Sequence, residues 1–145
     1  MSETYYIGVD LGTTRTTVVT STGKRITKVT CVGYANNPIA KKRIGGKDYL
    51  LGEEAEANRL ALEMVWPLGE GTIKEDQNSL DATRLILKDI IAEAIPNKKP
   101  DDKVYAAIGV PAEAGKKNKT DIIDITKDFI DKVLIISEPF AVAYS

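Results

Sequence analysis

The 145-residue chain contains no histidine and a single cysteine, Cys31. These absences exclude Ser-His and Cys-His nucleophilic pairs, the usual zinc ligand sets and an internal disulfide. Chemistry must therefore come from carboxylates, hydroxyls and backbone amides. Cys31 lies in the alternating segment ITKVTCVGY, where we expect a half-buried packing residue. A lone cysteine also fits a reducing compartment.

Long apolar runs and a charge excess are also missing. No run approaches the roughly 20 apolar residues of a membrane span, and the opening MSETYY lacks the basic start of a signal peptide. The net charge is -1, from 20 basic and 21 acidic residues, so no overall field favours nucleic acid or an anionic membrane. We therefore expect a cytoplasmic, soluble protein that does not insert into membranes. Its length suits one domain.

The most informative motif is YIGVDLGTT, from Tyr6 to Thr14. An apolar strand carries Asp10 to its end, and a sharp turn at Gly12 directs the amides and hydroxyls of Thr13 and Thr14 into one concavity. Such a nest suits phosphate. A plain β-hairpin is the alternative, in which Gly supplies a positive φ and Asp caps the turn. The motif alone does not decide between them.

Segments rich in β-branched residues at 7–11, 16–20 and 26–32 predict a three-stranded meander. From Gly33 to Ile73 the pattern changes to short pieces, with a strand at 49–51 and a short helix in GEEAEANRL. No long period runs through this stretch. It therefore reads as a small insertion into the main layer.

A regular helical period follows and predicts a helix over 78–95, whose apolar face includes Leu80, Leu87 and Ile91. We expect Asn78 or Ser79 to cap its start and Pro96 to end it. The charged tract 97–103 reads as a solvated loop, since its two aspartates argue against a basic patch for nucleic acid.

An apolar strand over 104–110, a helix over 117–132 and a second apolar strand over 133–136 follow. This order is typical of a parallel pair with a right-handed crossover. The chain is therefore α/β, with a mixed sheet of about five strands.

Four stretches follow one another in the order found in the first half of the actin-like ATPase superfamily, which includes actin, MreB, DnaK-type chaperones and sugar kinases. They are DLGTT at 10–14, LGEEA at 51–55, PLGEGTI at 67–73, and the pair AAIGVPA at 106–112 and SEPFAVAY at 137–144. The resemblance covers nearly the whole chain. It implies a ribonuclease-H-like mixed five-stranded sheet with flanking helices, in which residues 1–32 and 74–145 form subdomain IA and residues 33–73 form the inserted subdomain IB.

Within the superfamily the sequence looks most like the magnetosome actins of the MamK branch. The similarity rests on VGY at 32–34, on IGVPAEA with Asn118 and Lys119 shortly after it, and on SEPF where chaperones have NEPT. MreB-like and plasmid-segregating actins are the nearest competitors.

The resemblance also implies roles for individual residues. Asp10 corresponds to the acid that orients hydrated Mg²⁺, and Gly12, Thr13, Thr14 and the backbone of Arg15 correspond to the loop that lines the ATP phosphates.

Glu138 of SEP corresponds to the residue that positions the attacking water. Taken alone, Glu138 also fits a helix N-terminal acid followed by Pro139 as a helix starter.

Two departures from the family pattern limit these expectations. Actin has a lysine in its phosphate hairpin, where this chain has Thr16 and Thr17, so a direct cationic contact is in doubt. No second phosphate loop of the DxGxGTTD kind follows Tyr144, and no glycine-rich adenosine loop is present. ATP lies between two halves in this superfamily, so we expect this half alone to be inactive.

The leading hypothesis is the first half of a cytoskeletal ATPase that binds Mg-ATP and polymerises into filaments organising a cytoplasmic cargo such as magnetosomes. Its partners would be further copies, a full-length actin-like protein or magnetosome-associated proteins. One alternative is a truncated, non-catalytic half-actin that regulates a full-length filament protein. A fragment of a chaperone or kinase ATPase domain is another.

Overall fold

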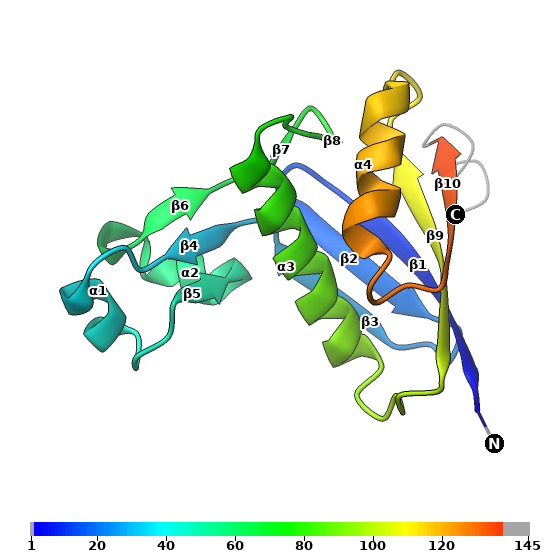
Figure 1. Cartoon of the computed structure of the whole chain (residues 1–145), viewed down its shortest axis with the longest axis horizontal. Helices are drawn as coiled ribbons and strands as arrows, with labels where there is room; N and C mark the ends of the chain where they lie inside the picture. Colours follow the sequence, from blue (N-terminus) through cyan, green and yellow to red (C-terminus); the bar gives the residue numbers. More distant parts are fainter. Residues whose placement is uncertain (1, 138–145) are drawn as a thin grey trace.

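The computed structural model describes residues 2–137, and its centre is a mixed sheet of five strands in the order β10-β9-β1-β2-β3 (Figure 1). The strands are β1 (Thr4–Leu11), β2 (Arg15–Thr20), β3 (Arg25–Val29), β9 (Lys103–Val110) and β10 (Lys132–Ser137). β1, β2 and β3 pair antiparallel, whereas β9 runs parallel to both β1 and β10. The expected α/β class and five-stranded mixed sheet are confirmed.

Two helices, α3 (Gln77–Ala94) and α4 (Lys116–Thr126), pack on one face of this sheet (Figure 1). Strict alternation in β1 directs Ile7, Val9 and Leu11 into the core beneath them. Their partners in that core include Leu87, Ile90 and Ile91 of α3, Val104, Ile108 and Val110 of β9, and Ile122 of α4. The opposite face of the sheet leaves Tyr6, Val19 and Leu134 exposed. The sheet is therefore covered on one face only within the described residues.

The chain that follows β3 forms a small lobe, residues 32–65, that projects from the sheet (Figure 1). Its elements are β4 (Val32–Tyr34), α1 (Pro38–Arg43), β5 (Tyr49–Leu51), α2 (Gly52–Ala57), the 3₁₀ turn η1 (Arg59–Ala61) and β6 (Glu63–Val65). β4 is the centre of a three-stranded sheet between β5 and β6. The expected strand at 49–51 and the helix after it are confirmed.

The predicted continuous strand over 26–32 is wrong. β3 ends at Val29, where the Cys31 N–H donates to the Val29 carbonyl at 3.0 Å, and Val32 then starts β4 in the other sheet. Cys31 is completely buried and its thiol donates to the Gly52 carbonyl at 3.4 Å. Burial raises the pKa of this thiol to about 11. Its packing role is confirmed, although it is fully rather than half buried.

A short hairpin, β7 (Leu68–Gly69) and β8 (Thr72–Ile73), follows the small lobe and returns to the large sheet. Leu68 and Ile73 are buried in the main core with β1 and α3. At the hairpin tip, Gly71 has φ +81°, and a Cβ there would lie 2.7 Å from Cγ of Pro111. The Gly71 N–H donates to Oγ1 of Thr13 at 2.7 Å. The tip thus contacts the turn after β1 and the loop after β9.

The ends of both long helices differ from expectation. The cap of α3 is Asp76, whose carboxylate accepts from the Ser79 N–H at 2.8 Å and the Ser79 hydroxyl at 2.9 Å, so the assignment to Asn78 or Ser79 is wrong. α4 ends at Thr126, where the Thr126 hydroxyl donates to the Ile122 carbonyl at 2.7 Å. The predicted extension to residue 132 is therefore wrong, and Ile130 enters the core from a turn.

Asp102 is only 4% exposed, so the expectation of a fully solvated tract over 97–103 is wrong at this residue. Its carboxylate accepts backbone N–H groups from Lys99 and Glu3, each at 2.8 Å. These two hydrogen bonds lower the pKa of Asp102, that from Lys99 most. The buried carboxylate therefore ties the start of β1 to the loop before β9.

We predict that Asp102→Asn removes a pH-dependent part of the stability. Because the folded pKa is lowered, this contribution is full above the unfolded value of about 3.9 and is lost as pH falls through the folded pKa. The thermal midpoint of the variant should lie below that of the wild type at neutral pH, with the gap closing in acid. Asp101→Asn, at an exposed neighbour, is the matched control. An equal gap at neutral and strongly acidic pH would contradict the assignment.

We also predict that Thr13→Val destabilises the chain by about 1 kcal/mol, because the Gly71 N–H loses the hydroxyl that accepts its hydrogen bond. Thr13→Ser keeps the hydroxyl and should restore most of this loss. The free energy of unfolding in urea measures both variants. Identical values for the valine and serine variants would show that the hydroxyl does not hold the hairpin tip.

Candidate functional site

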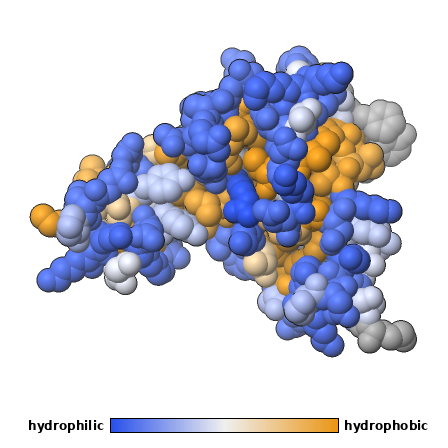
Figure 2. Space-filling model, viewed as in Figure 1, coloured by the Kyte–Doolittle hydropathy of each residue, from blue (hydrophilic) through white to orange (hydrophobic). Residues whose placement is uncertain are grey.

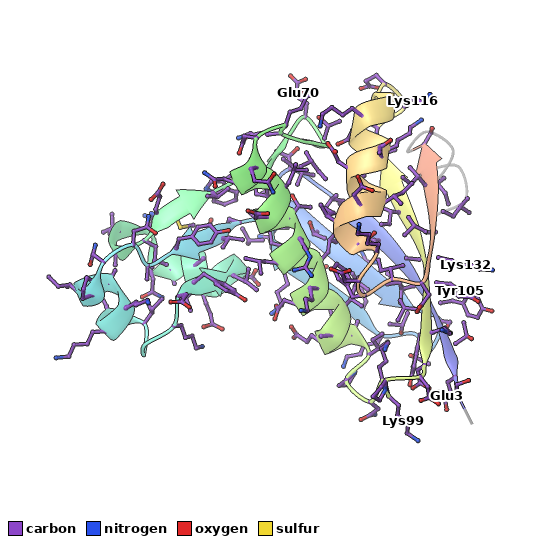
Figure 3. The ribbon with its side chains drawn as sticks, viewed as in Figure 1. Glu3, Glu70, Lys99, Tyr105, Lys116 and Lys132 are labelled. Carbon is purple, nitrogen blue, oxygen red and sulfur yellow. The ribbon has the colours of Figure 1, made fainter. Side chains whose placement is uncertain are left out.

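The candidate site lies at the edge of the large sheet where parallel strands end. β1, β9 and β10 run in the same direction, so their carboxyl ends meet at this edge, which is where open α/β sheets bind ligands. Asp10 lies opposite Gly109 of β9. Figure 3 shows Glu70 of the hairpin tip and Lys116 of α4 at this end, and Glu3 and Lys99 at the other.

Asp10 lies on the face of the sheet that the helices leave open. Its neighbours Val9 and Leu11 are buried in the core, so alternation places Asp10 on the opposite face, where it is exposed. Its partner on β2 is Thr17. No ion pair involves Asp10 among residues 2–137. Its carboxylate is therefore accessible to a hydrated cation.

The turn at Gly12 requires glycine because of a close approach. A Cβ at this position would lie 2.4 Å from the carbonyl oxygen of Arg15, a distance that real side chains do not reach. Gly12 does not have a positive φ, so the conformational basis of the plain-hairpin alternative is wrong, although the turn does join antiparallel strands. The sequence predicts the sharp turn correctly.

Two contacts from distant segments hold the turn. Oγ1 of Thr13 accepts the hydrogen bond from Gly71, so the hydroxyl proton of Thr13 is not used in this contact. The carbonyl of Thr14 accepts from the Thr30 N–H at 2.8 Å. The side chains of Thr13 and Thr14 are exposed. The loop is thus held by hydrogen bonds at Thr13 and Thr14, and both side chains remain exposed.

The structure shows how Arg15, Thr16 and Thr17 lie relative to Asp10, where a lysine of the actin type would contact phosphate. Thr16 is buried and shares a 2.8 Å hydrogen bond with the Thr30 hydroxyl, so it faces away from Asp10. Thr17 is on the same face as Asp10 and bonds Thr27 at 2.9 Å. Arg15 is exposed at the start of β2 and is the only cation of this turn. Directly opposite Asp10, at position 17, the chain therefore has a hydroxyl and no ammonium group.

Glu138 and its neighbour Pro139 lie outside the described residues, so the predicted water-positioning role stays a prediction. The chain leads into Glu138 from Ser137, the last residue of β10, which lies opposite Val110. β10 is two strands from β1, a separation of about 10 Å at the usual strand spacing. Asp10 and the end of β10 are therefore at one edge of one sheet.

Residues 2–137 hold no group of three or more His, Cys, Asp or Glu side chains able to bind a metal directly. A single carboxylate such as Asp10 suits Mg²⁺, which keeps several waters when few protein oxygens bind it. Within the same residues, no helix is long and apolar enough to cross a membrane.

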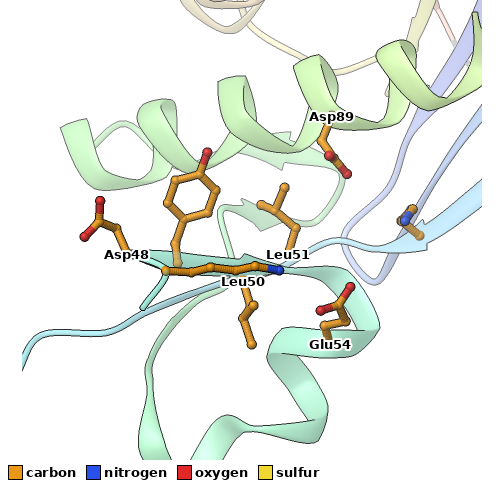
Figure 4. A pocket seen from close by; sticks show the side chains of 8 residues that line it. Asp48, Leu50, Leu51, Glu54 and Asp89 are labelled. Carbon is orange, nitrogen blue, oxygen red and sulfur yellow. The ribbon is translucent and has the colours of Figure 1, made fainter. Parts of the chain in front are cut away.

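A separate hollow of about 400 Å³ lies between the small lobe and α3 (Figure 4). Asp89 of α3 and Glu54 of α2 are on its two sides, and Lys28 forms an ion pair with Glu93 at 2.8 Å beside it. Partial burial raises the pKa of Asp89. The hollow shares no residue with the Gly12 turn, so it is not part of the candidate site.

Sequence reasoning missed Thr30 and the contact of Gly71 with Thr13. The only signal for Gly71 was its place in PLGEGTI, which carries the resemblance but does not indicate a contact 58 residues away. Thr30 offered no signal, because the segment around it reads as one continuous strand.

The sequence of this chain is similar to those of known actin-like proteins. The actin-like protein MamK of Paramagnetospirillum magneticum is 34% identical over 140 residues, which are 96% of this chain and 40% of that protein. MamK of Magnetospirillum gryphiswaldense is also 34% identical, over 96% of this chain and 38% of its own length. No family model matches the chain. The chain spans about two fifths of the length of these curated relatives.

Solved structures give the same result. A MamK double helical filament superimposes with a TM-score of 0.90 at 33% identity, covering 98% of this chain and 43% of that one. A non-polymerising MamK mutant bound to AMPPNP gives 0.85 at 32% identity, covering 99% and 44%. MreB5 of Spiroplasma citri bound to ADP, at 0.71 and 20% identity over 92% and 38%, shares the fold. In both sequence and fold, the chain is therefore similar to part of the actin-like protein MamK.

Proposed function

We propose that this chain is part of a cytoskeletal ATPase that holds Mg-ATP between two halves and polymerises into filaments. The observation that carries the proposal is the turn from Gly12 to Arg15, closed by a backbone contact that only glycine permits and fixed by Gly71 and Thr30. A rigid loop with exposed hydroxyls at the carboxyl edge of a sheet is preorganised for phosphate oxygens. MamK bound to AMPPNP is among the similar structures.

The residues of the turn have distinct tasks in this proposal. Asp10 would hold Mg²⁺ through its waters, and the metal would neutralise phosphate charge. The hydroxyl of Thr13 accepts from Gly71 and so has its proton free to donate to a phosphate oxygen. The exposed hydroxyl of Thr14 and the backbone of Arg15 complete the loop. Glu138 would orient the attacking water from the end of β10.

The open face of the sheet supports a second half. Parallel strands are normally covered on both faces, yet here the face opposite α3 and α4 leaves Tyr6, Val19 and Leu134 exposed. Asp10 is on this uncovered face. A nucleotide at the edge would therefore receive its remaining contacts, including the adenine pocket, from a further part of a longer polypeptide.

Filament assembly is proposed from the relatives, since a MamK double helical filament has the highest TM-score, 0.90, of the structures reported above. We propose subdomain IA for residues 1–32 and 74–145, and subdomain IB for residues 33–73. The filament would work in the cytoplasm on a cargo such as magnetosomes, with other copies and magnetosome-associated proteins as partners. The separate core of the small lobe supports the division, whereas Leu68 and Ile73 pack with the large sheet.

We predict that the 145-residue chain alone binds Mg-ATP weakly or not at all and hydrolyses it negligibly, because about half of the phosphate contacts and the adenine pocket are absent. Calorimetric titration measures the affinity, and release of inorganic phosphate measures the hydrolysis. Binding at micromolar Kd would contradict the division of the site between two halves.

In a longer polypeptide that joins this sequence to a second half, we predict that Glu138→Ala binds Mg-ATP normally but releases phosphate at least about 100-fold more slowly. Filaments of the variant should then persist in a pelleting assay, whereas wild-type filaments disassemble as ATP is used. Glu113→Ala, an exposed acid after β9, is the matched control. Unchanged phosphate release would remove Glu138 from the mechanism, and a wild type that does not pellet would contradict filament assembly.

A further inference from the structure

The hairpin of β7 and β8, whose tip contacts Thr13, is too short to hold its own shape. Each strand has two residues, and a hairpin of that size is not stable alone in water. Both turn residues also have positive φ, 53° at Glu70 and 81° at Gly71. This conformation is unfavourable for glutamate, because its Cβ approaches the following carbonyl oxygen. Contacts with other elements must therefore fix the hairpin.

One of these contacts comes from Asn118 in the first turn of α4. Its side-chain oxygen Oδ1 accepts a hydrogen bond from the Ile73 N–H at 3.0 Å. The neighbouring Lys74 N–H donates across the hairpin to the Pro67 carbonyl at 2.8 Å. Because successive N–H groups of a strand point in opposite directions, the Ile73 N–H points away from β7 and has no partner within the hairpin. Asn118 supplies the acceptor that the hairpin lacks.

The hydrogen bond of Asn118 is the polar link between the hairpin and α4 among the described residues. A hollow of about 420 Å³ lies between the two elements, lined by Glu70 and Lys74 on one side and by Lys117 on the other. No ion pair of residues 2–137 crosses this hollow. Figure 2 shows that this end of the molecule is mainly hydrophilic. The position of β8 relative to α4 therefore depends on this hydrogen bond, together with the buried side chain of Ile73.

Only the acceptor half of the Asn118 amide is used. Its Nδ2 group is buried and has no hydrogen-bond partner among residues 2–137. A buried donor without a partner is unfavourable, and few are found in native proteins. Because the oxygen of the same amide holds Ile73, we attribute the asparagine at this position to that oxygen. A carboxylate at position 118 would keep an acceptor, whereas alanine would remove it.

The contact of Asn118 extends to the turn after β1 through the hairpin tip. Ile73 is two residues from Gly71, whose N–H donates to Oγ1 of Thr13 at 2.7 Å. This hydrogen bond occupies an acceptor position of the Thr13 hydroxyl and leaves the hydroxyl proton for another acceptor. A shift of β8 would move the Gly71 N–H and change how the Thr13 hydroxyl is oriented. The first turn of α4 is thus connected to the candidate phosphate loop by two hydrogen bonds and a short piece of backbone.

We propose that Asn118 is a positioning residue for the phosphate-binding turn. It acts through the hairpin and does not itself touch the nucleotide. By holding the Ile73 N–H, it keeps the Gly71 N–H against Thr13, so that the proton of the Thr13 hydroxyl is directed at a phosphate oxygen. This inference rests on the proposed function and adds a side chain of α4 to the groups that set nucleotide affinity.

The first test is amide hydrogen exchange, followed by NMR, in the 145-residue chain. Asn118→Ala should speed the exchange of both the Ile73 and the Gly71 N–H about tenfold, because a hydrogen bond is lost and the tip opens more often. Asn118→Asp keeps an oxygen acceptor and should restore slow exchange at both. Thr120→Val is the matched control, since it removes an exposed hydroxyl of the same helix that donates to the Lys116 carbonyl at 3.1 Å.

A third amide separates a local effect from a general loss of stability. The Val104 N–H donates to the Asp131 carboxylate at 2.8 Å at the start of β9, and it should exchange at the wild-type rate in every variant. Circular dichroism checks that each variant is folded. The proposal is overturned if Asn118→Ala leaves Gly71 exchange unchanged, since the contact would then end at Ile73. It is also overturned if Thr120→Val speeds Gly71 exchange equally, since a weaker α4 would then explain the result.

The second test uses the longer polypeptide that joins this sequence to a second half. Asn118→Ala should raise KM for Mg-ATP about tenfold and change kcat less than about twofold, because a positioned phosphate donor is lost while the attacking water is held elsewhere. A merely structural role would reduce the amount of active protein, which lowers kcat and leaves KM unchanged. Asn118→Asp should restore KM.

The two tests distinguish a failure of this inference from a failure of the proposed function. A wild-type polypeptide that binds Mg-ATP with an alanine variant of equal KM would remove Asn118 from the positioning of the turn. A wild-type polypeptide that does not bind Mg-ATP would contradict the proposed function itself. In that case the exchange rate of Gly71 would still show whether Asn118 holds the hairpin tip against Thr13.

Discussion

The alternation of β1 is the constraint on which the rest of the structure depends. Ile7, Val9 and Leu11 occupy the core under α3 and α4, and this burial fixes the register of the strand. A slip by one residue would bury Asp10 and expose the core side chains. Because β1 pairs antiparallel with β2 and parallel with β9, its carboxyl end is at once a tight turn and part of the ligand-binding edge. The position of the candidate site follows from the packing of three apolar side chains.

Local patterns predicted most of the elements, and contacts between distant segments account for the errors. The five strands and both long helices were predictable, because the spacing of apolar residues that indicates them is a local property of the sequence. The break at Thr30 was not, because a chain of β-branched residues continues across it while Val32 changes to another sheet. Asp76 was missed as a cap because Asn78 and Ser79 are equally good capping residue types. The buried carboxylate of Asp102 depends on Glu3, 99 residues away.

The residues of the candidate site were likewise predictable from local sequence, whereas the contacts that hold them in place were not. Asp10 and the turn through Arg15 were predictable because a strand end, a glycine and two threonines are consecutive in the sequence. The hydrogen bonds that hold this turn could not be predicted, because their donors, Gly71 and Thr30, come from separate segments of the chain. The sharp turn at Gly12 was predicted correctly, but the sequence did not show why the turn requires glycine. Its role is to let the Arg15 carbonyl approach, and a positive φ is not involved.

The arrangement of Thr16 and Thr17 decides how phosphate charge would be balanced. Of these two, only position 17 is on the face of Asp10, and a hydroxyl stands there, so the residue of β2 directly opposite the acid is not a cation. In the proposed complex, the charge of the triphosphate must then be met by Mg²⁺ near Asp10, by the N–H dipoles of the turn and by Arg15. Dipoles act only over short distances and in fixed orientations, so such a site depends on a rigid loop more than a lysine-based site does. The hydrogen bonds that Gly71 and Thr30 donate to the turn provide that rigidity.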